Sequence, residues 1–206
     1  MSISGPEVKM MRLSFKEMKD AIAKIVPKDI QYDVDLEAGD IAIVTPTPDA
    51  FGGGDGLVGQ IAKKIKRRIV LRPHESIIKS EIETEEFIRN LLTEKSKIEM
   101  IYFDRCYCEV TVVCGNPGEA VGRRGANSKA IRDECGWLVK FERKAPIHSK
   151  TIHDIRGYRS AQWKERKKLL KDFGLNIYRP KRPGAFWVRT TGLGSYREVG
   201  RACHLV

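Results

Sequence analysis

The short sequence Gly122-Arg123-Arg124-Gly125 combines residue types that can hold a phosphate group. Glycines at both ends lack the Cβ atoms that would keep a sugar-phosphate chain away, and they permit positive φ in a tight turn. The two arginines between them add fixed charges whose forked donors match phosphate oxygens. A G-x-x-G pattern alone is weak, because any corner between two helices can contain one, so its surroundings must decide.

The surroundings of this loop favour a clamp for a nucleic-acid backbone. Short helical segments are expected at Glu119 to Val121 and Asn127 to Cys135, with an apolar strand beyond each. The second helix begins at about Ala126, so its unpaired N–H groups and the positive end of its dipole face the loop. Bases would lie over that helix and the neighbouring strand. The predicted contact residues are Gly122, Arg123, Arg124, Gly125, Ala126, Asn127, Lys129, Ala130 and Ile131.

The elements around this clamp are predicted to occur twice, at a spacing of roughly seventy residues. Each copy runs helix, strand, strand, glycine loop, helix and strand. In the first copy, Ser14 and Glu17 predict a capping box for a helix that Pro27 ends. The other elements predicted for this copy are strands at 31–36, 40–44 and 69–72 and a helix at 60–68. Those predicted for the second copy are a helix at 81–95 through Ile82, Phe87, Ile88, Leu91 and Leu92, and strands at 98–103, 106–114 and 138–142.

The glycine loops of the two copies differ in charge. The first, Gly56-Leu57-Val58-Gly59, has apolar residues between its glycines and Asp55 just before them, which opposes phosphate. We therefore expect the second copy to bind most of the phosphate. The helix after the first loop offers a cationic face, which either adds to binding or is simply solvated. The secondary candidates are Gly56, Gly59, Lys63, Lys64 and Arg67.

Composition agrees with a polyanionic partner. The chain has 206 residues and a formal net charge of +11, from 38 Lys plus Arg and 27 Asp plus Glu. A balance this basic is typical of proteins that meet polyanions, and nucleic acid is the one favoured here. No apolar run is long enough to span a membrane, and the N-terminus lacks the apolar core of a signal peptide. The sequence predicts a cytoplasmic protein with no membrane partner.

Metal or cysteine chemistry has little support. The cysteines that suggest zinc are Cys106, Cys108, Cys114 and Cys135, but no C-x-x-C pair occurs. On a strand, Cys106 and Cys108 would share a face with Val110 and Val112, which favours buried thiols. His148, His153 and Asp154 are better explained as a solvated helix start. An enzyme that uses Cys135 or His148 is not favoured, because neither has a partner at a telling spacing.

The C-terminal part is predicted to be a basic helix, a linker and a hairpin. Residues 151–173 have a helical pattern with a sparse apolar seam at Ile155, Tyr158 and Leu169. This helix is either a basic arm on RNA or a link between domains. Residues 178–183 form a stiff proline-rich linker. From 186, a strand, a turn at 192–195 and a strand at 199–206 follow, and the chain stops within that strand, which suggests that it was cut from a longer protein.

The second copy, from Ile98 to Glu142, resembles a K-homology (KH) domain of the prokaryotic type II arrangement. Such domains hold about four nucleotides of single-stranded RNA or DNA between the G-x-x-G loop and an apolar groove. The first copy resembles a degenerate version. The expected fold is α/β (α+β), organised as a flexible tail (1–11), a first KH-like domain (12–74), a second KH domain (75–147), a basic helix with a Pro-rich linker (148–184) and the start of a metallo-β-lactamase domain (185–206).

Nearly the whole chain is similar to the N-terminal region of archaeal cleavage and polyadenylation specificity factor proteins. These are metallo-β-lactamase and β-CASP ribonucleases, so the resemblance implies roles in RNA 3′-end formation and transcription termination. The H-x-H-x-D-H zinc motif of that family is absent from the sequence. We therefore expect this chain to have no cofactor and no catalytic activity, with two zinc ions belonging to a nuclease domain beyond Val206.

Two functions of different classes follow. The first is a single-stranded RNA-binding module that presents RNA to the nuclease domain in cis. The second is an assembly module that docks the nuclease to itself, as a homodimer, or to transcription machinery. Base preference, RNA against single-stranded DNA, and oligomeric state are left open by the sequence.

Overall fold

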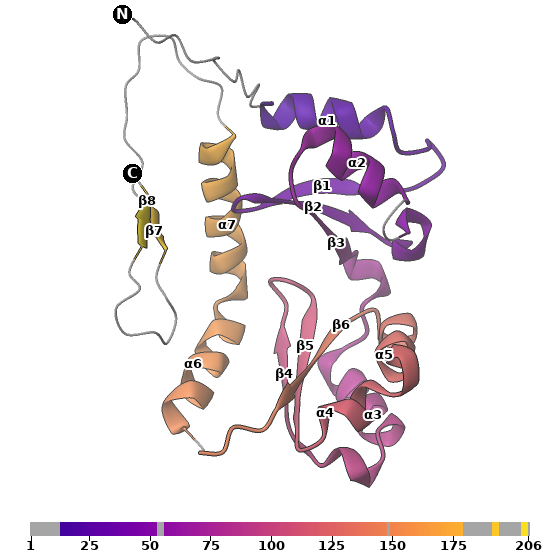
Figure 1. Cartoon of the computed structure of the whole chain (residues 1–206), viewed down its shortest axis with the longest axis vertical. Helices are drawn as coiled ribbons and strands as arrows, with labels where there is room; N and C mark the ends of the chain where they lie inside the picture. The colour runs from indigo at the N-terminus through magenta and orange to yellow at the C-terminus, as the bar shows by residue number, and fades with distance from the viewer. Residues whose placement is uncertain (1–12, 53–55, 148, 179–190, 194–202, 206) are drawn as a thin grey trace, which may run out of the picture.

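The computed structural model describes residues 13–52, 56–147, 149–178, 191–193 and 203–205. Two three-stranded sheets with their helices follow one another along the long axis, and two helices from the C-terminal half run beside both (Figure 1). We call the part from α1 to β3 the first unit and the part from α3 to β6 the second unit. The mixture of helices with small sheets agrees with the predicted α+β class.

The first unit contains the elements expected for the first copy. Its bounds are α1 Phe15–Ala23, β1 Asp33–Glu37, β2 Asp40–Thr45, α2 Leu57–Ile65 and β3 Ile69–Pro73. The capping box predicted at α1 is present, because the Ser14 hydroxyl accepts from the Glu17 N–H and the Glu17 carboxylate accepts from the Ser14 N–H at 2.7 Å. β1 and β2 are antiparallel and β2 and β3 are parallel. Apolar side chains of α1, the sheet and α2 form one core.

The second unit repeats this topology. Its bounds are α3 Glu81–Leu91, β4 Ile98–Asp104, β5 Glu109–Cys114, α4 Pro117–Val121, α5 Ala126–Cys135 and β6 Leu138–Arg143. β4 and β5 are antiparallel, and β5 and β6 are parallel. A second core gathers apolar side chains of α3, the sheet and α5, with Trp137 against Phe103 at 5.0 Å between ring centroids. The repeat predicted from element order is therefore present as a repeated topology.

Two details of the second unit differ from prediction. Helix α3 ends at Leu91, because Leu92 is already extended (ψ 132°) and a 3₁₀ turn at Glu94–Ser96 follows. Ile82 is 80 % exposed, so it is not part of the buried stripe of this helix. Apolar spacing alone could not reveal that the helix turns this residue outward.

The cysteines predicted on a strand lie in a turn. β5 begins only at Glu109, and Cys108 has φ of +52°, so the alternation proposed for Cys106 and Cys108 is wrong. Cys106 is nevertheless buried, and burial raises the pKa of the Cys108 thiol to about 11. In the part of the chain that the structure describes, no three His, Cys, Asp or Glu side chains gather as metal ligands.

The predicted basic helix is two helices that link the units. These are α6 Lys150–Ala161 and α7 Trp163–Ile177, separated at Gln162. Helix α6 contacts β4, where the Ser160 hydroxyl donates to the Phe103 carbonyl at 2.8 Å. Helix α7 lies on β1 so closely that a Cβ on Gly174 would be 2.5 Å from the Leu36 Cβ. Through these contacts α6 lies against the second unit and α7 against the first.

The apolar seam predicted on this segment does not face a core. Ile155, Tyr158 and Leu169 are all more than half exposed. The contacts come instead from other residues. Arg166 donates to both carboxylate oxygens of Asp104, and Tyr178, at the end of α7, is buried in the first core with its hydroxyl donating to the Gly39 carbonyl.

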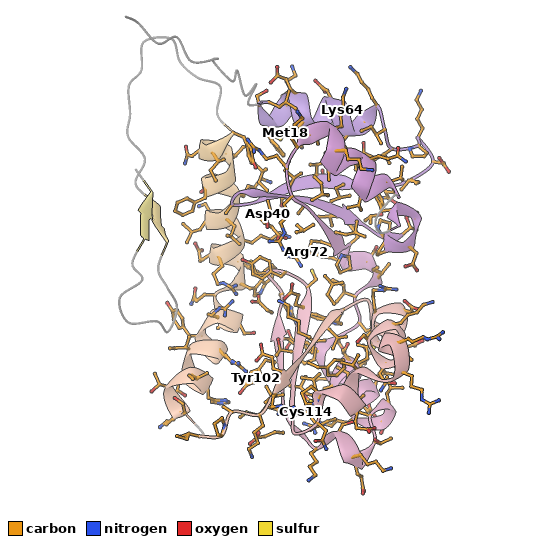
Figure 2. The ribbon with its side chains drawn as sticks, in the orientation of Figure 1. Met18, Asp40, Lys64, Arg72, Tyr102 and Cys114 are labelled. Carbon is orange, nitrogen blue, oxygen red and sulfur yellow. The ribbon has the colours of Figure 1, made fainter. Side chains whose placement is uncertain are left out.

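Arg72 joins the two units. Its guanidinium donates twice to Glu37 at 2.7 Å and once to Glu109, across the unit boundary, at 2.9 Å. It also lies 5.0 Å from the centroid of the Tyr107 ring. Its side chain is 14 % exposed and lies between the two sheets (Figure 2). Burial disfavours the charged form, but the two hydrogen-bonded carboxylates outweigh this effect and raise the pKa of Arg72.

A small antiparallel pair follows near the C-terminus, β7 Thr191–Leu193 with β8 Cys203–Leu205. Gly192 and Leu193, which were expected in a turn, belong to β7. The predicted tail at 1–11, the linker at 179–183 and the strand at 186–190 lie outside the described residues. Among the described helices, none has the length and apolar character needed to cross a bilayer.

Candidate nucleic-acid interface

The loop between α4 and α5 uses both of its glycines for conformations that other residues disfavour. Gly122 has φ +74° and ψ 171°, and Gly125 has φ +77° and ψ 22°. The Gly125 N–H donates to the Gly122 carbonyl at 3.1 Å, which closes the turn. Arg124, between them, is also left-handed at φ +52°. Three positive-φ residues in four make a tight corner, in which both glycines are half-buried.

Asn127 stabilises this corner through a hydrogen bond to the preceding helix. Its side-chain amide donates to the Ala120 carbonyl at 3.0 Å, which ties the start of α5 to the end of α4. A Cβ on Gly122 would lie 3.0 Å from the Asn127 side chain, so a larger residue would disturb this hydrogen bond. Asn127 was predicted to contact RNA, but its amide is engaged within the protein. This hydrogen bond positions the loop, and the contact of Asn127 with RNA stays a prediction.

The cations of the loop are exposed and available. Arg123, Arg124 and Lys129 are exposed, and within the described residues none of the three has an ion-pair partner. No side chain caps α5, so the N–H groups of its first turn have no side-chain acceptor. Because the positive end of a helix dipole adds to these charges, the corner attracts anions. Backbone, helix end and side chains all point to phosphate as the ligand chemistry.

The remaining predicted contact residues divide by burial. Ala126 is exposed and Ala130 is half-buried, so both are accessible beside the loop. Ile131 has no exposed surface and belongs to the core of the second unit. The prediction that Ile131 contacts bases is therefore wrong for this structure, because a helix turns adjacent residues to different sides. Ile131 supports the helix on the sheet instead.

The glycine loop of the first unit is not where the sequence pattern placed it. Gly56 is the N-cap of α2, and Leu57 and Val58 pack against the first core, so Gly56 to Gly59 is a helix start and not a loop. The counterpart of Gly122 is Gly52, whose φ of +55° and ψ of 167° are close to those of Gly122. It follows the 3₁₀ helix Pro48–Phe51, which takes the place of α4. The glycine run after Phe51 was the signal that the sequence analysis missed.

Charges near the first loop are largely committed to other groups. Asp49 accepts from Arg132 of the second unit at 3.4 Å, and Arg67 lies over the Tyr178 ring at 6.0 Å. Lys63 and Lys64 are exposed on α2, and Lys64 points away from the unit boundary (Figure 2). The structure therefore does not bring the secondary candidates Gly56, Gly59, Lys63, Lys64 and Arg67 together into a phosphate-binding corner.

Comparisons with known proteins identify the family to which this architecture is related. Residues 12–78 match the family described as "Transcription termination factor FttA, KH domain". The match falls on the first unit, which the sequence analysis treats as the degenerate copy. Over these residues the first unit is similar to that KH family.

Curated relatives extend the similarity beyond that unit. The chain is 34% identical over 192 residues to transcription termination factor FttA of Thermococcus kodakarensis, covering 93% of this chain and 30% of the relative. It is 33% identical over 195 residues to the protein of that name from Methanothermobacter thermautotrophicus, covering 94% of this chain and 31% of the relative. The chain thus spans about 30% of the length of these relatives.

Proposed function

We propose that this chain is a single-stranded RNA-binding module that acts in transcription termination, and that its phosphate clamp is Gly122 to Gly125. The observation that carries the proposal is the exposed pair Arg123 and Arg124 on a positive-φ glycine corner at the start of α5. The names of the relatives and the KH match support the same role.

The second unit is, in this proposal, a second type II KH domain in tandem with the first. Its topology, helix, two antiparallel strands, two helices and a strand parallel to the second, supports this assignment. The proposed boundaries are 12–74 and 75–147. The paired strands β7 and β8 would open a metallo-β-lactamase domain.

Binding at the clamp requires no side-chain contact with a specific base. Backbone N–H groups of the corner and of the first turn of α5 would donate hydrogen bonds to phosphate oxygens, while Arg123 and Arg124 neutralise the phosphate charge. Ala126 and Ala130 are small, so the strand can approach α5 closely. Affinity of this kind is sequence-tolerant and depends steeply on salt. In this proposal, RNA cleavage belongs to a zinc-dependent nuclease domain in cis beyond Val206. The transcription elongation machinery is a further proposed partner.

The experiment is fluorescence anisotropy with a labelled single-stranded RNA at two salt concentrations. The Arg123→Asp, Arg124→Asp variant is compared with the wild type and with Lys16→Asp, Lys28→Asp, a control of equal charge change at exposed lysines of the first unit. We expect loss of binding in the loop variant, and near wild-type binding in the control. Equal losses in both variants would show that net charge, not the corner, carries the affinity. No binding by the wild type at low salt would reject the proposal.

An assembly role is the second candidate, favoured by an exposed apolar surface on α6 and α7. Tyr158 and Phe173 are 69 % and 62 % exposed. Surfaces of this kind often mark protein contacts. The Tyr158→Glu, Phe173→Glu variant would lose self-association in sedimentation velocity if this surface docks a second copy, while RNA binding would be retained. A monomeric wild type would remove homodimerisation from this alternative.

A further inference from the structure

A cleft of about 680 Å³ lies between the two units. One wall comes from the first unit, where the segment after β2 and the end of β3 contribute Pro48 and Leu71. The other comes from the end of α5 and the start of β6, where Gly136 and Leu138 lie. These parts of the two units are on the side of the molecule away from α7 (Figure 1).

One wall of the cleft is fixed by contacts between residues 77–79 and the end of α5. Gly136 is left-handed (φ +74°), and a Cβ there would collide with the carbonyl of Ile77, which also lines the cleft. The Lys79 N–H donates to the Cys135 carbonyl at 3.0 Å, and the Trp137 indole donates to the Lys79 carbonyl at 2.9 Å. The connection between the units is thus bonded to the end of α5. Because the wall is bonded in this way, the cleft exists before a ligand arrives.

The chemistry of the lining suits a base and not a phosphate. Both cations that line the cleft are already paired: Arg72 with Glu37 and Glu109, and Arg132 with Asp49 and Asp133 at 3.4 and 3.3 Å. Much of the remaining lining is proline, leucine and isoleucine. An apolar surface whose arginines are already in ion pairs does not attract an anion. It can instead bury a planar group, such as a nucleotide base, away from water.

The position of the cleft relative to the clamp suggests where that base comes from. The clamp is at the start of α5, and Arg132 and Gly136 are at its end. The ten residues of α5 span about 15 Å at the usual helical rise. A KH corner clamps about four nucleotides. A strand that follows α5 from the corner therefore reaches the cleft just beyond the clamped segment.

We infer that the cleft between the units is a second binding subsite, which receives an unstacked base of the strand whose phosphates are held at Gly122 to Gly125. This inference rests on the proposed function, because it takes the strand from that clamp. It adds that the cleft between the units is itself part of the RNA path, so that the strand is contacted beyond the corner at Gly122 to Gly125.

The test is a length series of oligoribonucleotides from four to eight residues, extended at the 5′ or the 3′ end, with binding measured by anisotropy. Extension at one end should raise affinity on the order of tenfold, as expected when a base buries several tens of Å² of apolar surface. The Ile77→Glu variant should lose this gain while binding the tetranucleotide normally. Ile147→Glu, the same change at an exposed isoleucine after β6, is the matched control.

A second measurement does not depend on a variant. Oligonucleotides with one 4-thiouridine at successive positions are cross-linked to the wild type, and the attached peptides are mapped by mass spectrometry. Bases beyond the clamped segment should attach to 46–52, 71–77 or 136–138. Affinity that stops rising at four residues, with cross-links confined to 122–131, would overturn the cleft alone. Failure of every oligonucleotide to bind would overturn the clamp and the cleft together.

Discussion

The two units have one topology and opposite surroundings for their glycine corners. Gly52 and Gly122 have nearly the same backbone angles, each after a short helix that follows the second strand of its sheet. Yet Asp49 lies near the first corner, in an ion pair with Arg132, whereas Arg123 and Arg124 on the second are exposed. The fold supplies a similar corner in both units, and the proposed phosphate clamp is assigned to the one that carries exposed arginines. The family match covers the first unit, so it does not include the corner at Gly122 to Gly125 that carries the two exposed arginines.

The units also differ in how they are completed. The core of the second unit is built from described residues between Ile78 and Phe141, which lie close together in the chain. The first core includes Ile177 and Tyr178, from the end of α7. The first unit is thus closed by chain that comes after the second, and the two units are joined both by Arg72 and by α6 and α7.

The largest expected effect is on the joint between the units. Arg72→Ala leaves the Glu37 carboxylate largely buried without its partner, so we expect a loss of about 3 kcal/mol in unfolding free energy. Urea denaturation followed by circular dichroism measures it. Arg68→Ala is the control, because its contact with Asp40 is 3.7 Å and its side chain is 77% exposed. If the Arg72 ion pairs contribute little to stability, both variants will show equal, small losses in unfolding free energy.

Alanine substitutions at two glycines distinguish the cost of a steric clash from the cost of a strained backbone angle. Gly136 and Gly125 both have positive φ, but a Cβ on Gly136 would meet the Ile77 carbonyl, whereas nothing lies within 4 Å of a Cβ on Gly125. Gly136→Ala should lower the unfolding free energy by about 2 kcal/mol, and Gly125→Ala by about 1 kcal/mol. Thermal unfolding of both variants gives the difference. Equal effects would mean that the connection between the units yields easily.

The capping boxes of α1 and α3 test whether the units are equally dependent on their first helices. Ser80 caps α3 as Ser14 caps α1, with Glu83 and Glu17 in the same positions. Ser14→Ala and Ser80→Ala should each cost about 1 kcal/mol in chemical denaturation. A much larger loss for one of them would show that its unit controls the unfolding of the whole chain.

The same variants have a pH dependence of known sign. Hydrogen bonds from Ser80, through its side chain and then its backbone, lower the pKa of Glu83, and those from Ser14 lower the pKa of Glu17. A lowered folded pKa gives stability that is present above the unfolded value and lost as pH falls through the folded one. The difference between wild type and either variant should therefore shrink below about pH 4. A difference that grows toward low pH would contradict this.

The smallest expected effect concerns the exposed ion pair across the cleft. Arg132 and Asp49 have side chains that are 39% and 81% exposed, so their coupling in a double-mutant cycle should be below about 0.5 kcal/mol. Unfolding of Arg132→Ala, Asp49→Ala and the double variant measures it. A coupling as large as the effect of Arg72→Ala would mean that the units are held at the cleft as firmly as at their buried joint.

Local signals in the sequence predicted most of the fold. The Ser14 capping box, the strand pairs and the G-x-x-G corner with a helix from Ala126 depend on residues close together in the chain. Their physical causes are also local: cap hydrogen bonds, alternation and positive φ. The repeat of element order then followed, because both units use the same sequence of local elements.

What the sequence could not show depends on distant contacts. Ile131 and Ala130 are adjacent, and only the packing of α5 on the sheet decides which is buried. The G-x-x-G pattern also occurs at Gly56 to Gly59, but there Leu57 and Val58 belong to α2 and pack against the first core. The seam predicted at Ile155, Tyr158 and Leu169 is exposed, because α6 and α7 are held by other residues: Arg166 with Asp104, and the end of α7 in the first core.

The burial of Tyr178 in the first core has a consequence for the order in which the protein is made. Its hydroxyl meets the Gly39 carbonyl, 139 positions earlier in the chain. During synthesis the N-terminal unit emerges first, but it lacks this part of its core until α7 has left the ribosome. The second unit, made later, has all of its own core residues sooner after they emerge. Folding on the ribosome should thus finish in the reverse of the order of translation, with the N-terminal unit sealed last.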